Sequence, residues 1–450
     1  MSDEVTALLD TVRERVDPDA EERRKLRDVT ETVIERAERA IESHDLAADV
    51  MLVGSTARDT WIAGDRDIDV FVRFPPETDR GRLETRGLEI GHDVLPDGHE
   101  EYAEHPYVVG EIDGYDVDLV PCYDVEDATA IQSAVDRTPF HTQYLHARLT
   151  DELAADVRLC KAFLKGIGVY GSDLRTRGFS GYLTELLVVE HGGFRPLVEA
   201  AADWQPPVRF DPAAHGQATF DDSLVVIDPT DPERNVGAAL AKANVATFQH
   251  YARQLLADPR ESLFEPADPD PISPDDVRAF FERRGTTPLA VTLPTPDLVE
   301  DDLYPQLEKS LEGIVGLLDR RGFDVLRADG FAGDRVVLLA ELAVAERPAV
   351  ERHVGPPVHV RDHAEGFYES YQDTDAYGPF VEGDRYVVER ERDYRCADAL
   401  VRSDELFQVA LGTAIEDALE DGYEVLVGSA AADLATDFGT ELAAYCAPKP

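Results

Sequence analysis

A glycine–serine turn, followed by a strand that carries two aspartates, constrains this chain more than any other stretch. Residues 49–53 form an apolar run that ends at Gly54-Ser55. Such a turn exposes consecutive backbone N–H groups at the start of a short predicted helix, and N–H groups in this arrangement bind phosphate. Residues 67–74 then alternate acidic and apolar side chains, so in a strand Asp67 and Asp69 project from the same face. The stretch therefore predicts a phosphate-binding turn beside two carboxylates that form a cation site.

A third carboxylate is expected from a neighbouring strand. Residues 115–121 follow Asp113-Gly114, a pair typical of a hairpin turn. Asp116 and Asp118 lie two positions apart and share a face, so alternation alone does not choose between them. Three carboxylates beside a phosphate-binding turn suit two Mg²⁺ ions about 4 Å apart, which clamp the attacking and leaving oxygens of an in-line phosphoryl transfer.

The order of these features resembles the nucleotidyltransferase signature of the DNA polymerase β superfamily. In that signature a Gly-Ser pair comes first, a pair of carboxylates follows, and a single carboxylate comes later. An Asp-x-Asp pair on an acidic surface is more often simply solvated. The upstream Gly-Ser turn and the downstream acidic hairpin favour the catalytic interpretation.

The charge of the chain is strongly negative, with a formal net charge of −48 over 450 residues. Such a charge would ordinarily argue against a nucleic-acid partner, because phosphate neutralisation needs a basic face. Here the acidic residues are spread over nearly every segment, and lysine is almost absent. This bias is typical of proteins from a high-salt cytoplasm, where charges are screened within about 3 Å at 1 M salt. The source is therefore predicted to be a halophile, and the global charge says little about partners.

The cysteines and the apolar runs indicate the compartment. The four cysteines, Cys122, Cys160, Cys396 and Cys446, are far apart and form no C-x-x-C pair, so neither structural zinc nor disulfides are predicted. The N-terminus is charged from Asp3 onward, and no apolar run approaches the roughly 20 residues that a bilayer-spanning helix needs. The chain is expected to be soluble and cytoplasmic.

The chain is predicted to be an α+β multidomain protein. With 43% hydrophobic residues it can build more than one core. Residues 1–140 are predicted to form a catalytic head with a mixed sheet and N-terminal helices. Residues 141–260 are expected to be a helical neck that binds nucleotide, and residues 276–450 an α+β body and tail. A linker rich in Asp and Pro, residues 257–275, separates the neck from the body.

The hydrophobic periodicity predicts individual elements within these domains. Two helices are expected in residues 4–44, with a break at 17–19. One helix is expected after Pro75-Pro76, up to residue 90, and another is expected to begin near Ser180 as its N-cap. The remaining expected helices cover residues 151–164, 236–256, 303–321, 397–419 and 430–445. The expected strands cover residues 67–74, a hairpin over 107–122, 289–293, 335–345 and 423–427. Residues 348–394 are predicted to be loop-rich, and their aromatic cluster is either a local core or a surface for stacking on RNA.

Two basic features stand out in this lysine-poor sequence. Lys161 and Lys165 lie one helical turn apart and precede a glycine-rich segment at 166–171, which favours phosphate binding over an ordinary solvated face. Arg234 ends a proline-rich loop from Asp228, and its guanidinium can read a base edge or grip phosphate.

Six motifs taken together resemble the archaeal class I CCA-adding enzymes, the tRNA nucleotidyltransferases. The resemblance covers nearly the whole chain. The motifs are Gly-Ser-Thr-Ala-Arg from Gly54 with its Asp-Ile-Asp, Asp-Leu-Val-Pro from Asp118, Arg-Thr-Pro-Phe-His from Arg137, Lys-x-Phe-Leu-Lys-Gly-Ile-Gly-Val-Tyr-Gly from Lys161, Arg-Gly-Phe-Ser-Gly-Tyr-Leu from Arg177 and Asp-Pro-x-Asp-Pro-x-Arg-Asn-Val from Asp228.

The resemblance implies a role for each matching residue. It makes Asp67, Asp69 and Asp118 the catalytic metal ligands, and thereby selects Asp118 over Asp116. The nucleotide-binding residues that it implies are Gly54, Ser55, Arg58, His141, Lys161, Tyr170 and Arg234. It also implies that the body and tail bind the acceptor and TΨC arms of tRNA. Candidate arginines for that surface are Arg278, Arg283, Arg284, Arg320, Arg321 and Arg327, unless they pair with the abundant acidic residues.

The expected reaction is template-independent addition of CCA to tRNA from CTP and ATP, with two Mg²⁺ ions and release of pyrophosphate. One alternative with the same chemistry is a poly(A) polymerase or an oligoadenylate synthetase. Another is a catalytically idle module that binds RNA or senses nucleotides. No membrane partner is expected, and the oligomeric state is left open, with a homodimer as one option.

Overall fold

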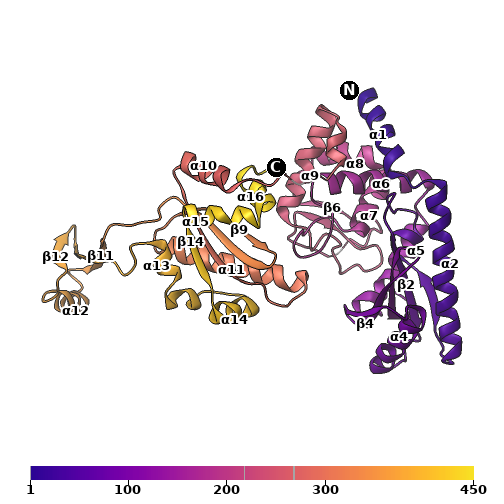
Figure 1. Cartoon of the computed structure of the whole chain (residues 1–450), viewed down its shortest axis with the longest axis horizontal. Coiled ribbons are helices and arrows are strands. Elements are labelled where there is room, and N and C mark those ends of the chain that lie inside the picture. The colour runs from indigo at the N-terminus through magenta and orange to yellow at the C-terminus, as the bar shows by residue number, and fades with distance from the viewer. Residues whose placement is uncertain (1, 217, 267–268) are drawn as a thin grey trace. The chain divides into compact units, whose positions relative to one another are not determined.

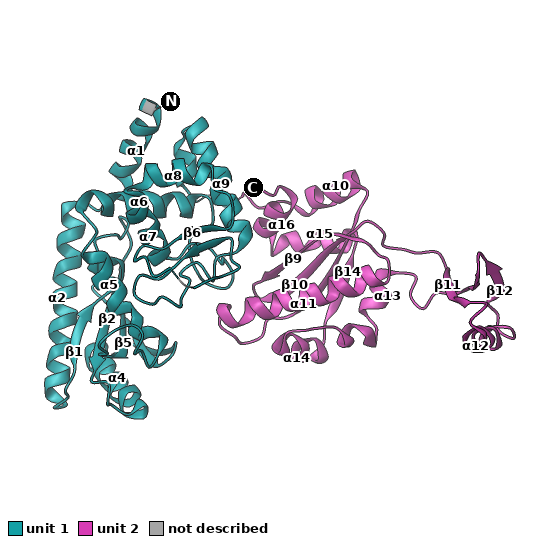
Figure 2. Ribbon diagram, turned by 180° about the vertical axis from the view of Figure 1, so that it is seen from behind, with its two compact units in different colours: residues 1–267, 450 teal, residues 268–449 magenta. Residues whose placement is uncertain are grey.

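The chain divides into two compact units in a computed structural model that describes residues 2–216, 218–266 and 269–450. Unit 1 comprises residues 1–267 with residue 450, and unit 2 comprises residues 268–449 (Figure 2). The division falls within the segment 257–275 that was expected to be a linker, of which residues 267–268 lie outside the description. Every helix in the described ranges is too short or too polar to cross a membrane.

Unit 1 is a mixture of helices and short strands (Figure 1). Its elements are α1 (Ser2–Val16), α2 (Ala20–Ser43), β1 (Asp49–Leu52), α3 (Gly54–Ala57), β2 (Asp67–Phe74), α4 (Arg80–Val94), β3 (His99–Tyr102), β4 (Pro106–Ile112), β5 (Tyr115–Tyr123), the 3₁₀ helix η1 (Ala134–Arg137), α5 (Thr138–His146), α6 (Asp151–Gly166), α7 (Gly181–His191), α8 (Phe194–Ala202), β6 (Val208–Phe210), β7 (Leu224–Val226), α9 (Lys242–Ala257) and η2 (Glu261–Phe264).

The first part of unit 1 is a five-stranded mixed sheet in the order β1-β2-β5-β4-β3. Strands β2 and β5 are parallel, and the other neighbouring pairs are antiparallel. Helices α2 and α4 pack on one face, where Val33, Ile68 and Leu119 lie in a common core. The predicted N-terminal helices and the hairpin are confirmed. The helices separate at residues 17–19 because Asp19 caps α2 in a capping box with Glu22.

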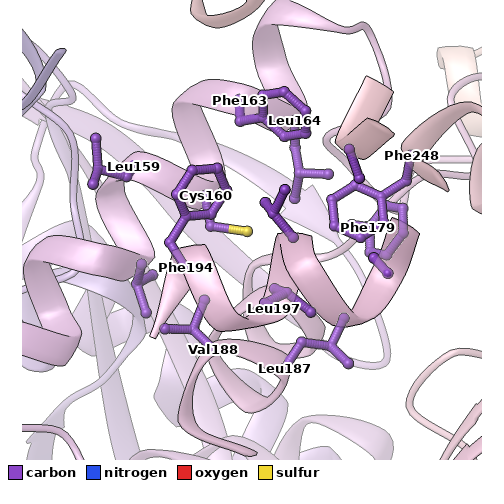
Figure 3. Close-up of a cluster of buried hydrophobic side chains, with 14 of the residues drawn as sticks. Leu159, Cys160, Phe163, Leu164, Phe179, Leu187, Val188, Phe194, Leu197 and Phe248 are labelled. Carbon is purple, nitrogen blue, oxygen red and sulfur yellow. The ribbon is translucent and has the colours of Figure 1, made fainter. Parts of the chain in front are cut away.

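The second part of unit 1 is mainly helical and has its own core. Phe163 of α6 packs against the rings of Phe194, Phe248 and Phe264. Figure 3 shows apolar side chains of α6, α7, α8 and α9 gathered in this core. Ser180 accepts a hydrogen bond from Leu183 N and caps α7, as predicted. The core fixes α6 and α7 against each other, and both helices carry polar residues that matter for the site.

Unit 2 is built around a four-stranded sheet in the order β14-β8-β10-β9. Its elements are α10 (Pro274–Arg284), β8 (Thr287–Pro294), α11 (Glu300–Arg320), β9 (Val325–Ala332), β10 (Arg335–Leu342), β11 (Val350–Pro357), α12 (Arg361–Tyr371), β12 (Tyr377–Glu382), β13 (Arg385–Glu391), α13 (Ala397–Val401), η3 (Asp404–Gln408), α14 (Thr413–Asp421), β14 (Glu424–Val427), α15 (Ser429–Ala432), η4 (Asp433–Thr436) and α16 (Gly439–Cys446). Separate apolar cores cover its two faces, one with α11 and α14 and the other with α10, α15 and α16.

The prediction of a loop-rich segment at 348–394 was wrong. Strands β11, β13 and β12 form an antiparallel sheet, and α12 packs on it. The predicted aromatic cluster lies at this contact, where Phe367 packs near His353, Tyr371 and Tyr386. These rings are half-buried against one another, whereas Tyr377 is 73% exposed.

Three predicted helices are shorter or more broken than expected. The helix expected at 236–256 begins only at Lys242, because the Asn235 side chain bonds to Val226 N and Gly237 N and holds the preceding residues in turns. The helix expected at 397–419 breaks before Gly412, whose Cα lies against Gln306 of α11 with no room for a side chain. The helix expected at 430–445 is divided into α15, η4 and α16.

Candidate active site

The Gly54 turn lies directly against a carboxylate of the sheet. Gly54 has φ +70°, and a Cβ at this position would lie 1.8 Å from Asp69 Oδ2. Only glycine leaves that space and adopts this conformation without strain. Val53 N donates to Asp69 O at 3.0 Å, and Thr56 Oγ1 donates to Asp67 O at 2.7 Å. The turn is thus bonded to the strand that carries both aspartates.

The register of β2 and β5 sets the acidic residues opposite one another. Asp67 pairs with Asp116, and Asp69 pairs with Asp118. Because the two strands are parallel and pleated alike, all four side chains emerge on the same face. Asp116 is exposed near the beginning of β5, whereas Asp118 is partly buried. The structure therefore places Asp118 deeper in the site, beside the Asp69 that contacts the turn.

The carboxylates raise one another's pKa. Burial, followed by the charges of Asp69, Glu101 and Asp67, raises the pKa of Asp118 to about 6. The pKa of Asp69 is also raised, by burial and by the charge of Asp67, while Arg58 and Lys161 oppose the shift. A bound cation would relieve this repulsion. In the ranges that the structure describes, no three Asp, Glu, His or Cys side chains form a closed metal-ligating group. Two observations nevertheless relate Asp67, Asp69 and Asp118: the pairing register of β2 and β5, and the effect of their charges on one another's pKa.

Two buried cations lie next to these carboxylates. Arg58 Nε donates to Glu185 Oε2 at 2.9 Å, and its Nη1 donates to Thr142 Oγ1 at 3.1 Å. Lys161 is only 3% exposed, and its Nζ donates to Thr60 O at 2.8 Å. Burial lowers the pKa of Lys161 to about 8, which the charge of Glu185 opposes. An ordinary solvated surface was thus the wrong interpretation for Lys161.

Glu185 of α7 links Arg58 to Thr60, the residue whose carbonyl oxygen accepts from Lys161. Its side chain is fully buried, and it accepts hydrogen bonds from Arg58 Nε and Thr60 Oγ1. Tyr170 belongs to the same surroundings, because burial raises its pKa and the charge of Glu185 adds to the shift. Lys165 lies 5.5 Å from the Tyr170 ring centre and pairs with Asp65 at 3.3 Å. The turn, α6 and α7 therefore share one polar network.

His141 and Arg234 meet at a second buried carboxylate, that of Asp228. His141 Nε2 lies 2.9 Å from Asp228 Oδ2, and Arg234 Nη1 donates to the same oxygen at 2.8 Å. The His141 ring stacks on Tyr182 with 3.8 Å between ring centres. Burial lowers the pKa of His141, although the hydrogen bond with Asp228 opposes the shift, and the charges of Arg234 and Arg58 lower it further.

Most residues singled out in the sequence occupy this connected region of unit 1. Sequence reasoning missed Thr60, Thr142 and Glu185, and it gave no role to Asp228. A single glutamate within the apolar stretch of α7 was a usable signal for Glu185. The candidate arginines of unit 2 are different, because several are already paired: Arg278 with Asp275, Arg284 and Arg327 with Glu341, and Arg321 with Glu405.

Comparisons with known proteins match most of the chain to described domains. Family models match the nucleotidyltransferase domain at residues 34–141, the second domain of tRNA nucleotidyltransferase at 155–265, and the C-terminal domain of CCA-adding enzyme at 284–428. A CCA-adding enzyme of Haloarcula marismortui is 61% identical, with both chains covered completely. This chain belongs to the CCA-adding enzyme family.

Other CCA-adding enzymes support the same conclusion. That of Halobacterium salinarum strain R1 is 61% identical over 99% of both chains, and that of Halorubrum lacusprofundi is 58% identical over both whole chains. Among solved structures, Cid1 poly(U) polymerase with Mg and 3′-dATP bound aligns over 58% of this chain and 98% of its own, with 14% identity and a TM-score of 0.44.

Membership of the CCA-adding enzymes confirms several predictions. The enzyme class is a nucleotidyltransferase, the α+β fold class is as expected, and the relatives come from haloarchaea, as the acidic composition indicated. The family name implies tRNA and nucleoside triphosphates as substrates, and nucleotidyltransferases generally work with divalent metal ions.

Proposed function

We propose that the chain builds and repairs the 3′-terminal CCA of tRNA, without a template, from CTP and ATP. The 3′-hydroxyl oxygen of the RNA attacks the α-phosphorus of the nucleotide, and the bond to pyrophosphate breaks. The proposal rests above all on the contact between Asp69 and Gly54, with Asp118 in register beside it. In this arrangement the phosphate-binding turn and the carboxylates act on the same phosphate.

Asp67, Asp69 and Asp118 would hold the metal ions in this proposal. Their oxygen donors suit Mg²⁺, and their mutual repulsion is the charge that a cation neutralises. Two Mg²⁺ ions about 4 Å apart, when bound, would stabilise the attacking and leaving oxygens. Asp116 is exposed and would remain outside the ligand set.

The nucleotide would lie along the polar network. Gly54, Ser55 and Arg58 would bind the triphosphate, and Lys161 would offset the charge of the leaving pyrophosphate. Tyr170 and His141 would complete the pocket. Arg234 would read the base, because its side chain is 36% exposed while one of its nitrogens is fixed by Asp228.

The remaining expectations concern the tRNA and its surroundings. The head at 1–140, the neck at 141–260 and the body and tail at 276–450 stay as proposed boundaries, with the last binding the acceptor and TΨC arms. The match of residues 284–428 to the C-terminal domain of CCA-adding enzyme supports this assignment. We place the reaction in the cytoplasm, where tRNA is matured, and a homodimer remains one option for the assembly.

The deciding experiment is incubation of the full chain with tRNA that ends before CCA, in molar KCl with Mg²⁺. Product length on a gel should increase by two residues with CTP alone and by three with CTP and ATP. Asp69→Ala should abolish both additions while tRNA binding stays nearly intact. CTP addition retained in that variant would refute the metal assignment, and long products from ATP alone would indicate a poly(A) polymerase instead.

A further inference from the structure

Asp228 is a fully buried carboxylate in the loop between β7 and α9. Its Oδ1 accepts from Thr230 N at 2.9 Å, from Thr230 Oγ1 at 2.8 Å and from Tyr182 OH at 3.4 Å. Its Oδ2 accepts from Arg234 Nη1 and lies 2.9 Å from His141 Nε2. Burial alone would raise the pKa of Asp228, but the hydrogen bond from His141 and the bonds from Thr230 lower it well below its usual range. The side chain is therefore an anion with every acceptor position engaged.

One oxygen of Asp228 fixes two side chains from different elements. A carboxylate only accepts, so His141 Nε2 carries the proton in this contact. His141 belongs to α5, and its ring is also held by stacking on Tyr182. Arg234 comes from the loop itself, and within the described residues its side chain makes no other hydrogen bond. The guanidinium therefore keeps its remaining N–H groups for a ligand, in an orientation that Asp228 sets.

A large cavity begins where Arg234 emerges. It has a volume of about 980 Å³ and is lined by Arg137, Ser180, Asp231 and Arg234 among others. A guanidinium edge offers only donors to a base. Cytosine N3 and adenine N1 accept a hydrogen bond, whereas uracil N3 and guanine N1 carry a proton and donate one. A fixed donor edge therefore suits the two bases of CCA and opposes the other two.

We infer that Asp228 is the positioning residue that sets nucleotide selectivity, by holding the guanidinium of Arg234 in the orientation that accepts cytosine and adenine. This inference rests on the proposed function and adds to it a residue that does not touch the nucleotide. Without the carboxylate, Arg234 can rotate and present its donors to the carbonyl oxygens of uracil or guanine. Discrimination should then fall, whereas a merely structural role would lower the rates for all four nucleotides alike.

The neighbouring Asp231 provides a matched control. It lies in the same loop, and Arg137 Nε donates to its Oδ2 at 3.3 Å, so it also ties the loop to the segment that precedes α5. Its carboxylate makes no hydrogen bond with the side chains of His141 or Arg234 in the described part of the chain. Asp231→Asn therefore removes a loop carboxylate and an ion pair, but leaves the guanidinium of Arg234 fixed.

The test uses the full chain, tRNA that ends before CCA, Mg²⁺ and each nucleoside triphosphate in turn. The ratio of kcat/KM for CTP to that for UTP is compared between wild type, Asp228→Asn and Asp231→Asn. We expect Asp228→Asn to reduce this ratio at least about tenfold and Asp231→Asn to leave it within about twofold. Asp228→Asn with an unchanged ratio, or an equal loss in both variants, would overturn the inference.

Two further variants keep the outcome decisive. Thr230→Ala removes one hydrogen bond to Oδ1 but keeps the carboxylate, so it should lower the ratio about two- to fivefold even if Asp228→Asn shows no cooperative melting. An unchanged ratio in that case overturns the inference. In Asp228→Asn/Arg234→Ala the loss should not exceed that of Arg234→Ala alone, because Asp228 acts through Arg234. Failure of the wild type to extend tRNA would refute the proposed function instead.

Discussion

Glu185 in unit 1 and Glu341 in unit 2 are both fully buried and bind cationic side chains, but the two glutamates serve different purposes. Glu185 in unit 1 accepts from Arg58 and Thr60, with Lys161 nearby. Glu341 in unit 2 accepts from Arg284 at 2.5 Å, Thr286 at 2.7 Å, Tyr445 at 3.2 Å and Arg327 at 3.3 Å. Both side chains have no exposed surface.

The difference lies in what surrounds the paired cations. The charges of Arg58 and Lys161 lower the pKa of Asp69, and both residues are proposed to interact with the triphosphate. The partners of Glu341 pack on an aromatic cluster, with Arg327 over the ring of Tyr445 at 4.1 Å and Arg284 over Phe280 at 5.1 Å. A buried ion pair therefore does not identify a functional site by itself. Its cations must also face a second, unsatisfied charge.

The largest effect is expected from Glu185→Ala. The change leaves Arg58 without its partner at Nε and lets the guanidinium move, and a displacement of 1 Å in a catalytic group can reduce the rate about 100-fold. We expect kcat/KM for CTP addition to fall by about that factor, measured on protein whose folding is verified by circular dichroism. Glu185→Gln is the control, because its amide still accepts from Arg58 and can donate to Thr60. Wild-type kcat/KM in folded Glu185→Ala would remove the functional half of the comparison.

Glu341→Ala should instead affect stability with little effect on catalysis. It removes a buried carboxylate that accepts from two partly exposed arginines, Arg284 and Arg327, and from two hydroxyl groups, a change that should cost about 3 kcal/mol. Hydrogen–deuterium exchange of the β8 and β10 amides should report this loss locally, while kcat for CTP addition at saturating tRNA stays within about twofold of wild type. A large loss of kcat with unchanged exchange would mean that the two glutamates do not differ as described.

The pH dependence of stability should separate the two units. Burial lowers the pKa of Lys161 from 10.5 to about 8, so between these values the unfolded chain holds a proton that the folded chain has lost. The free energy of unfolding should therefore rise with pH across this window, by up to about 3 kcal/mol. Denaturant titrations at pH 8 to 10.5 should show the rise in the wild type and its absence in Lys161→Met. Equal slopes in both proteins would contradict the assignment.

Glu341 should shift stability with pH in the same direction as Lys161, but in the acid range. Burial alone would raise its pKa, but hydrogen bonds from Arg284 and Thr286 lower it below the ordinary value of 4.5. Its contribution to stability is therefore present above pH 4.5 and is lost as the pH falls through the lower, folded value. The protection factors of the β10 amides, which correct for the intrinsic exchange rate at each pH, should fall at acid pH in the wild type, and this fall should be weaker in Glu341→Gln.

The sequence predicted what is encoded locally. The alternation in residues 67–74 predicted that Asp67 and Asp69 share a face, since a strand has a period of two, and the Asp113-Gly114 turn predicted the hairpin. Alternation did not separate Asp116 from Asp118, because depth in the site depends on how the sheet is covered. The family resemblance was needed for that choice.

The contacts of the buried carboxylates Glu185 and Asp228 could not be predicted from local sequence patterns. Arg58 and Glu185 are 127 residues apart in the chain, and His141 and Asp228 are 87 apart. No periodicity connects such pairs, and their contact depends on how α5, α6 and α7 pack. The breaks near Gly412 and Asn235 were missed for the same reason, because a neighbouring helix or a side-chain bond ends each predicted helix there.

The smallest effect should come from an arginine pair on a single helix of unit 2. Arg284 and Arg278 both lie on α10, but Arg284 donates to the buried Glu341, whereas Arg278 pairs with Asp275 and Asp433, which are 94% and 64% exposed. Arg284→Ala should lower the free energy of unfolding by about 2 kcal/mol, because Glu341 keeps Arg327 and two hydroxyl partners but loses a charged hydrogen bond. Arg278→Ala should change it by less than about 0.5 kcal/mol, since exposed ion pairs contribute little. Denaturant titrations in low and molar KCl provide the measurement. If Arg278→Ala proved as costly as Arg284→Ala, burial of the carboxylate would not be what distinguishes these pairs.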